Sequence, residues 1–155
     1  MIICTKLFCI FNEKANPSEI SIAILPFDNL NDVENTQYFA DGVVEDLLSR
    51  LATIKDIKVI SRTSSEMFRD KGEKTVPEIG KLLGASHIVE GTVQRVEDDL
   101  RISVLLIDTK TDNHILSKLY DQNLSDIFRI QSEIAGKIAS ELSLALTNTE
   151  LEKLK

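Results

Sequence analysis

The chain has 155 residues, of which 43% are hydrophobic and 28% are charged, as is typical of one globular domain that buries a sizeable core. Its formal net charge is −7, and because a negative field repels phosphate backbones, nucleic acid is excluded as a first candidate partner. Both cysteines lie within residues 1–11, which excludes a disulfide framework and a zinc site made of four thiolates.

The first 19 residues differ from the rest of the chain. Residues 1–11, MIICTKLFCIF, are mostly apolar but contain a lysine, whereas a helix that crosses a membrane needs about 20 apolar residues. We therefore expect no complete membrane span here. The stretch also lacks the basic start and small-residue cleavage site of a secretory signal, so an edge strand, the stub of a truncated membrane helix and disorder stay open. Residues 12–19 are polar and contain a proline, which predicts a linker.

The domain begins with a buried strand and an amphipathic helix. Residues 20–25 are apolar at five of six positions, as in a strand of a parallel sheet that is covered on both faces. Pro26 ends the strand because proline has no N–H to donate. Residues 37–54 carry apolar side chains every three or four positions and predict a helix, in which Gly42 costs about 1 kcal/mol unless another element approaches it closely. Residues 57–61 predict a second short strand.

Two short helices are predicted after this strand. Residues 63–66, TSSE, and residues 75–78, TVPE, both match the capping box, in which a hydroxyl and a glutamate bond the backbone N–H groups of the first turn. Gly84 can supply the left-handed end of the second helix. Capping thus explains most of the hydroxyl groups here. Arg62 is left without an explanation of this kind.

The second half of the chain changes to extended segments and then to a long helix. Residues 86–96, 100–109 and 114–124 are separated by turn sequences, which predicts two consecutive hairpins. Residues 125–146 predict a long amphipathic helix, and residues 147–155 form an extension that could lead into helical repeats. The order of elements predicts an α/β domain whose first strands are parallel and joined by right-handed crossovers.

Six collinear motifs within residues 20–146 resemble one known family, the TolB amino-terminal-like domain, also called TolB-like or FlgO-like. The resemblance covers nearly the whole globular part of the chain. The motifs are IAILPFDNL, QYFADGVVEDLLSRLATI, IKVISRTSS, IGKLLGASHIVEGTVQRV, RISVLLIDTKTDNHI and DIFRIQSEIAGKIASEL.

The resemblance implies a mixed five-stranded sheet like that of the anticodon-binding domain, with strand order 2-1-3-4-5, the fourth strand antiparallel and helices packed on it. It also implies a bacterial protein, cytoplasmic or periplasmic, in which such domains accompany nucleotide cyclase or winged-helix modules and tetratricopeptide repeats. Neither a cyclase nor a winged-helix motif occurs in the sequence, so those activities are not assigned to this chain. Binding of tRNA is not implied either, because function belongs to sites rather than folds.

The sequence predicts no catalytic, cofactor or metal residues. His87 and His114 are the only histidines, and their spacing does not match a metal motif. Ser61, His87 and Asp108 could supply the residue types of a triad, but the chain lacks the G-x-S-x-G turn. The glycines do not form a phosphate loop. We therefore expect a chain that is not an enzyme and that needs no cofactor.

Two classes of function follow. The first is a non-catalytic sensory or scaffolding module in a signalling or envelope protein, which binds a protein partner or adjacent domains of its parent chain. The second is a receptor for a small anionic ligand that regulates an attached effector such as a cyclase. The candidate ligand or partner site lies where the first two strands end and consists of Asp28, Asn29, Arg62, Thr63 and Ser64.

Two roles stay open for Arg62, one functional and one structural. Its guanidinium should lie at the carboxyl edge of the sheet near a helix N-terminus, where anions are favoured. The alternative is a structural pair with a nearby carboxylate such as Asp28, which would tie two loops together.

Overall fold

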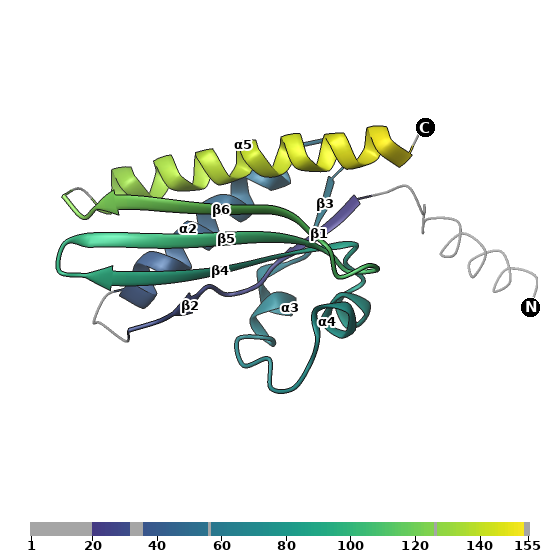
Figure 1. Cartoon of the computed structure of the whole chain (residues 1–155), viewed down its shortest axis with the longest axis horizontal. Helices are drawn as coiled ribbons and strands as arrows, with labels where there is room; N and C mark the ends of the chain where they lie inside the picture. Colours follow the sequence, from purple (N-terminus) through teal and green to yellow (C-terminus); the bar gives the residue numbers. More distant parts are fainter. Residues whose placement is uncertain (1–19, 32–35, 56, 126, 154–155) are drawn as a thin grey trace, which may run out of the picture.

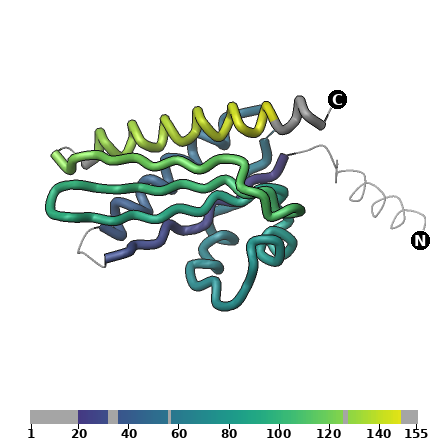
Figure 2. Tube along the Cα trace, viewed as in Figure 1, coloured from purple at the N-terminus to yellow at the C-terminus, as the bar shows by residue number. Residues whose placement is uncertain are grey.

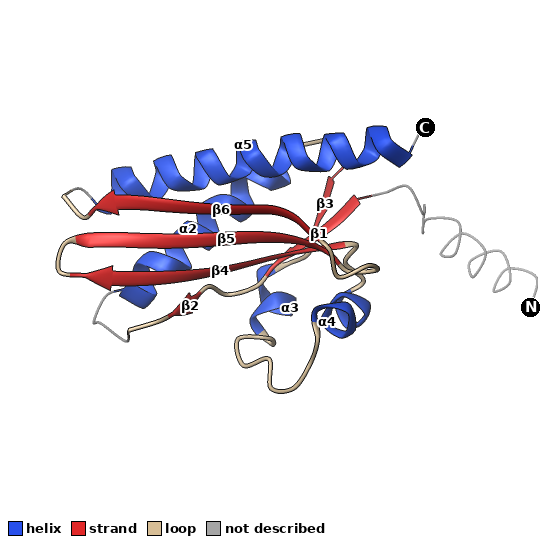
Figure 3. Cartoon of the chain, viewed as in Figure 1, coloured by secondary structure: helices blue, strands red, loops and turns tan. Residues whose placement is uncertain are grey.

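The computed structural model describes residues 20–31, 36–55, 57–125 and 127–153. The predictions for residues 1–19 lie outside these residues. The described part forms an α/β domain, in which a mixed sheet of parallel and antiparallel strands has helices on both faces (Figures 1 and 3). None of the described helices is long and apolar enough to cross a membrane.

The parallel part of the sheet is built around its first strand. β1 (Ile20–Ile24) is buried at every position and lies between β3 (Ile57–Val59) and β4 (His87–Val96), both parallel to it. Ile22 is the Cα partner of residues in both neighbours. The predicted central position of β1 and β4 is confirmed, because a strand paired and covered on every side needs the continuous apolar run that the sequence shows.

The antiparallel part follows β4 as two hairpins. β5 (Asp99–Asp108) and β6 (His114–Asn123) each pair antiparallel with the strand before them, and the path through the sheet is β3-β1-β4-β5-β6. This is the predicted order of the five strands. The sheet has a sixth strand, β2 (Asp28–Asn29), which pairs with β4 away from that path. The predicted elements do not include this strand.

The larger core lies between the sheet and two long helices. α2 (Thr36–Ala52) and α5 (Ile127–Lys153) lie side by side on one face (Figures 1 and 2). The close approach explains Gly42, because a Cβ atom there would lie 2.4 Å from Oε1 of Gln131 in α5. The core contains the buried residues Ile22, Ile24, Phe27, Phe39, Val43, Leu47, Leu51, Val89, Val93, Ile102, Val104, Leu106, Ile134, Ile138 and Leu142.

A smaller core lies on the opposite face. α3 (Arg62–Glu66) and α4 (Val76–Leu83) lie near the start of β4 (Figure 1). The buried residues of this core are Ala23, Leu25, Phe68, Ile79, Ala85 and Ile88. Successive residues of β1 therefore enter different cores, as the alternation of side chains along a strand requires.

Only one of the two capping predictions is confirmed. At α4, Oγ1 of Thr75 accepts from the N–H of Glu78 at 3.4 Å, and Oε2 of Glu78 accepts from the N–H of Thr75 at 3.1 Å. Gly84 ends this helix with φ 68°. The other prediction was wrong by two residues. Ser61 caps α3 and accepts from the N–H of Ser64 at 3.3 Å.

Candidate functional site

The structure places the predicted site residues in two separate settings. Asp28 and Asn29 form β2 and pair with β4, and Oδ2 of Asp28 lies 3.8 Å from Nζ of Lys71. Arg62 is the first residue of α3, which also contains Thr63 and Ser64. A shallow depression of about 480 Å³ is lined by Arg62 and Thr63 together with Glu66 and Met67. The lining therefore includes two of the five predicted residues.

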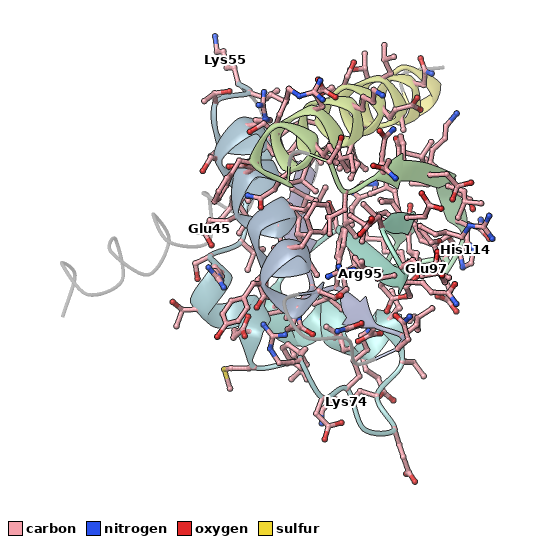
Figure 4. The ribbon with its side chains drawn as sticks, turned by 90° about the vertical axis from the view of Figure 1, so that its left-hand side faces the viewer. Glu45, Lys55, Lys74, Arg95, Glu97 and His114 are labelled. Atoms are coloured by element: carbon pink, nitrogen blue, oxygen red, sulfur yellow. The ribbon has the colours of Figure 1, made fainter. Side chains whose placement is uncertain are left out.

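Arg62 pairs with a carboxylate, but the carboxylate belongs to Glu45 rather than to Asp28. Glu45 projects from α2 towards α3 (Figure 4). The side chains of Arg62 and Glu45 are 44% and 55% exposed, so the pair contributes at most about 1 kcal/mol to stability. Asp28 was the wrong partner because β2 leads the chain away along β4.

A second arginine joins the same two elements. Nε of Arg69 donates to Glu66 at 2.7 Å, and its Nη2 donates to Asp41 of α2 at 3.2 Å. Burial lowers the pKa of Arg69, but the hydrogen bonds to Glu66 and Asp41 outweigh it and leave the pKa raised. Asp41 and Glu45 are one helical turn apart, so they share a face of α2. That acidic face receives one arginine from α3 and one from the segment that follows it.

The segment between α3 and α4, residues 67–75, is also held on the sheet. Nζ of Lys71 donates to Oε1 of Glu90 in β4 at 2.9 Å. Their side chains are only 25% and 22% exposed. Sequence patterns do not predict this contact, because Lys71 and Glu90 are 19 residues apart and Glu90 belongs to a different element. A lysine among charged loop residues gives no signal of a specific partner.

Two large apolar side chains border the ion pairs. Tyr38 and Met67 are each 79% exposed. Tyr38 lies one turn before Asp41 on α2 and so shares its face with Asp41 and Glu45. We call the surface formed by Tyr38, Asp41, Glu45, Arg62 and Met67 the α2–α3 face.

The residues considered for catalysis have structural roles. His87 is buried, and its Nδ1 lies 2.9 Å from Oγ of Ser86. Ser86 exchanges hydrogen bonds with Ser21 and so joins β4 to β1. Asp108 is the Cα partner of His87 on β5, whereas the hydroxyl of Ser61 caps α3.

The two histidines do not form part of a metal site within the described part of the chain. His114 is exposed at the start of β6, apart from buried His87 at the start of β4. No group of three or more His, Cys, Asp or Glu side chains within the described residues is placed to hold a metal ion.

No family model matches the chain. The sequence is 36% identical over 137 residues to a protein of Rhizobium meliloti (strain 1021) named "Putative adenylate cyclase 3". The match covers 88% of this chain and 23% of that protein. The chain therefore spans about a quarter of the length of this curated relative.

Several solved structures are similar in shape. TolB from Acinetobacter baumannii matches with a TM-score of 0.59 and 16% identity over 83% of this chain and 28% of TolB. Protein XCC0632 from Xanthomonas campestris matches with a TM-score of 0.58 and 7% identity over 88% and 93% of the two chains. Lipoprotein GNA1162 from Neisseria meningitidis matches with a TM-score of 0.54 and 15% identity over 83% and 96%. The chain thus has an α/β fold that is shared with part of TolB, with protein XCC0632 and with lipoprotein GNA1162.

Proposed function

We propose that this chain is a non-catalytic module through which a larger bacterial signalling protein binds another protein. The similarity to about a quarter of a protein named as an adenylate cyclase supports a place beside an effector module. The TolB-like fold supports the same class of function, a non-catalytic binding module. The sequence motifs further imply FlgO-like relatives and tetratricopeptide repeats next to this domain in the parent protein, and we include both in the proposal. Any cyclase activity would then belong to another module of the parent protein.

The observation that carries the proposal is the exposure of Tyr38 and Met67 on the α2–α3 face, 79% each. Exposed aromatic and methionine side chains within a polar surround are typical of surfaces that bind proteins. The ion pairs of Arg62 and Arg69 connect α2 with α3 and the segment after it. A partner would therefore meet a surface whose elements are already positioned relative to one another.

Site-specific photo-crosslinking tests the proposal. Tyr38 or Met67 is replaced by p-benzoylphenylalanine in the full parent protein, expressed in its own bacterium. Both positions should yield the same discrete adduct, identified by mass spectrometry. Lys55 and Lys74 are matched exposed controls on other parts of the surface (Figure 4). An adduct of equal yield at the controls, or none at positions 38 and 67, would contradict the proposal.

A second candidate function is a small-anion receptor, which the lining of the shallow depression by Arg62 and Thr63 favours. The ion pair with Glu45 opposes it, because an anion would have to compete with that carboxylate. Sulfate would then raise the melting temperature of the wild type and leave that of Arg62→Ala unchanged. An equal response of both proteins to sulfate would remove this candidate.

A further inference from the structure

One end of the domain exposes apolar side chains that lie in or next to three different elements. Leu30 follows β2, Val96 ends β4 and Phe128 is the second residue of α5, and they are 59%, 60% and 78% exposed. In Figure 1 these ends of the elements lie together on the left, opposite the side on which the described chain begins and ends. We call this surface, with the turn at residues 97–98, the distal end.

Hydrogen bonds join the parts of the distal end. The N–H of Leu30 donates to the carbonyl of Val93 in β4 at 2.9 Å, and the N–H of Leu124 donates to the carbonyl of Asp98 at 2.6 Å. Asn31 both donates to and accepts from the backbone of Arg95. The segment after β2, the β4–β5 turn and the connection to α5 therefore form one continuous surface.

This surface is hollowed. A depression of about 650 Å³ lies beside the turn and has both apolar and charged walls. It is lined by Gln94, Val96, Asp99, Leu100, Arg101, Asp121, Gln122 and Asn123. Its volume lies within the range of pockets that bind small ligands, which is sufficient for side chains of a bound polypeptide.

The turn at the distal end carries consecutive acidic residues. Glu97, Asp98 and Asp99 are all exposed, and within the described residues no ion pair involves any of these three carboxylates. Arg101 is engaged by Asp121, with Nε 2.8 Å from Oδ1.

Arg95 does not neutralise the turn. Its Nε donates to the backbone carbonyl of Glu97 at 2.8 Å rather than to a carboxylate. Figure 4 looks onto this end and shows Arg95 near its middle, with Glu97 to the right of Arg95. The carboxylates of the turn thus outnumber this one guanidinium.

We propose that the distal end binds a segment of another protein that carries basic residues beside apolar ones. The apolar side chains of such a segment would cover Leu30, Val96 and Phe128, and its cations would meet the carboxylates of Glu97 and Asp98. Complementary charge of this kind selects the partner and speeds its association. A second copy of the chain fits poorly, because a two-fold contact would place the same acidic turn against itself. The distal end shares no residue with the α2–α3 face, so each surface can be tested with its own substitutions.

Binding of synthetic peptides to the full 155-residue chain tests this proposal. A labelled peptide of alternating lysine and leucine is titrated by fluorescence anisotropy, beside a peptide of alternating glutamate and leucine. We expect only the lysine peptide to bind, and Asp98→Lys to raise its Kd about tenfold. Glu73→Lys is the matched control, because it changes the charge equally at an exposed position between α3 and α4 and should leave the Kd unchanged.

A second variant separates binding from folding. Glu97 has φ 54°, a conformation that glycine adopts without strain. Glu97→Gly therefore removes the charge without lowering the melting temperature and should still weaken the lysine peptide severalfold. Hydrogen exchange with the bound peptide should slow at residues 94–99 and 122–124.

Several outcomes would overturn the proposal. Equal weakening by Asp98→Lys and Glu73→Lys would mean that the peptide responds only to net charge. Binding of the glutamate peptide, failure of the lysine peptide to bind, or protection confined to other residues would also exclude the distal end as the site. None of these results bears on cross-linking at the α2–α3 face, so the two proposals fail separately.

Discussion

The two faces of the sheet are covered to very different extents. On one face, α2 and α5 provide 17 and 27 residues of helix and bury a large core against alternate residues of every long strand. On the other face, α3 and α4 provide 5 and 8 residues and bury the small core near the start of β4. The comparison indicates that stability depends mainly on the first face, whereas the second keeps strand surface available for contacts.

The exposed part of the second face is polar for a physical reason. Arg101 and Asp121 are Cα partners on β5 and β6, and the guanidinium bonds the carboxylate and lowers the pKa of Asp121. The neighbours of Arg101 in sequence, Leu100 and Ile102, belong to the large core. The alternation along β5 from Asp99 to Leu106 lets one strand contribute to the buried core on one face and to the exposed surface on the other.

The largest expected effect contrasts one side chain from each core. Leu47 of α2 and Ile79 of α4 are both 0% exposed. Leu47→Ala should lower the free energy of unfolding by about 4 kcal/mol and Ile79→Ala by about 2 kcal/mol. The loss at Ile79 is smaller because the thin layer formed by α3 and α4 can collapse into the cavity that the substitution leaves. Urea denaturation measures both values. Equal losses would show that the two faces contribute alike.

A glycine of β4 offers a sharper test of packing within the large core. A Cβ atom on Gly91 would lie 2.6 Å from the ring of Phe27, so Gly91→Ala should cost about 2 kcal/mol through overpacking. Phe27→Leu should be less harmful in the Gly91→Ala background than alone, as a double-mutant cycle of denaturation midpoints would reveal.

Gly136 of α5 is the matched control for Gly91. Its nearest neighbour would be 3.6 Å from an added Cβ, which is an ordinary contact. Gly136→Ala should therefore stabilise the protein by up to about 1 kcal/mol, because alanine favours a helix. A loss of stability there would mean that α2 and α5 lie closer than the structure describes.

The smallest expected effects concern the helix caps of the thinner face. Thr75→Ala should lower the free energy of unfolding by about 1 kcal/mol, because it removes half of the capping box of α4. Ser61→Ala should have a similar but smaller effect at the short α3. Thr63→Ala, which lies inside that helix, should cost less than about 0.5 kcal/mol. Thermal melts that rank Thr63 above Ser61 would restore the original capping prediction.

The sequence by itself determined the elements and their order. The apolar run of β1, the helical period of α2 and the capping box at Thr75 are local patterns, since each acts through neighbours along the chain or one turn away. They predicted the α/β class. The order of the five strands and the central place of β1 were implied by the resemblance of the sequence motifs to the TolB-like family. Of the five residues of the candidate site, Arg62 and Thr63 line a common depression, whereas Asp28 and Asn29 pair with β4.

Only the tertiary structure decided the partners of the charged residues. Arg62 meets Glu45 at a separation of 17 residues, and Arg69 meets Asp41 at a separation of 28. It also decided that β2 pairs with β4 and that the ends of β2 and β4 lie at the same end of the domain as the start of α5. A charged or apolar surface side chain has many possible neighbours of similar energy, and the packing of whole elements selects one of them.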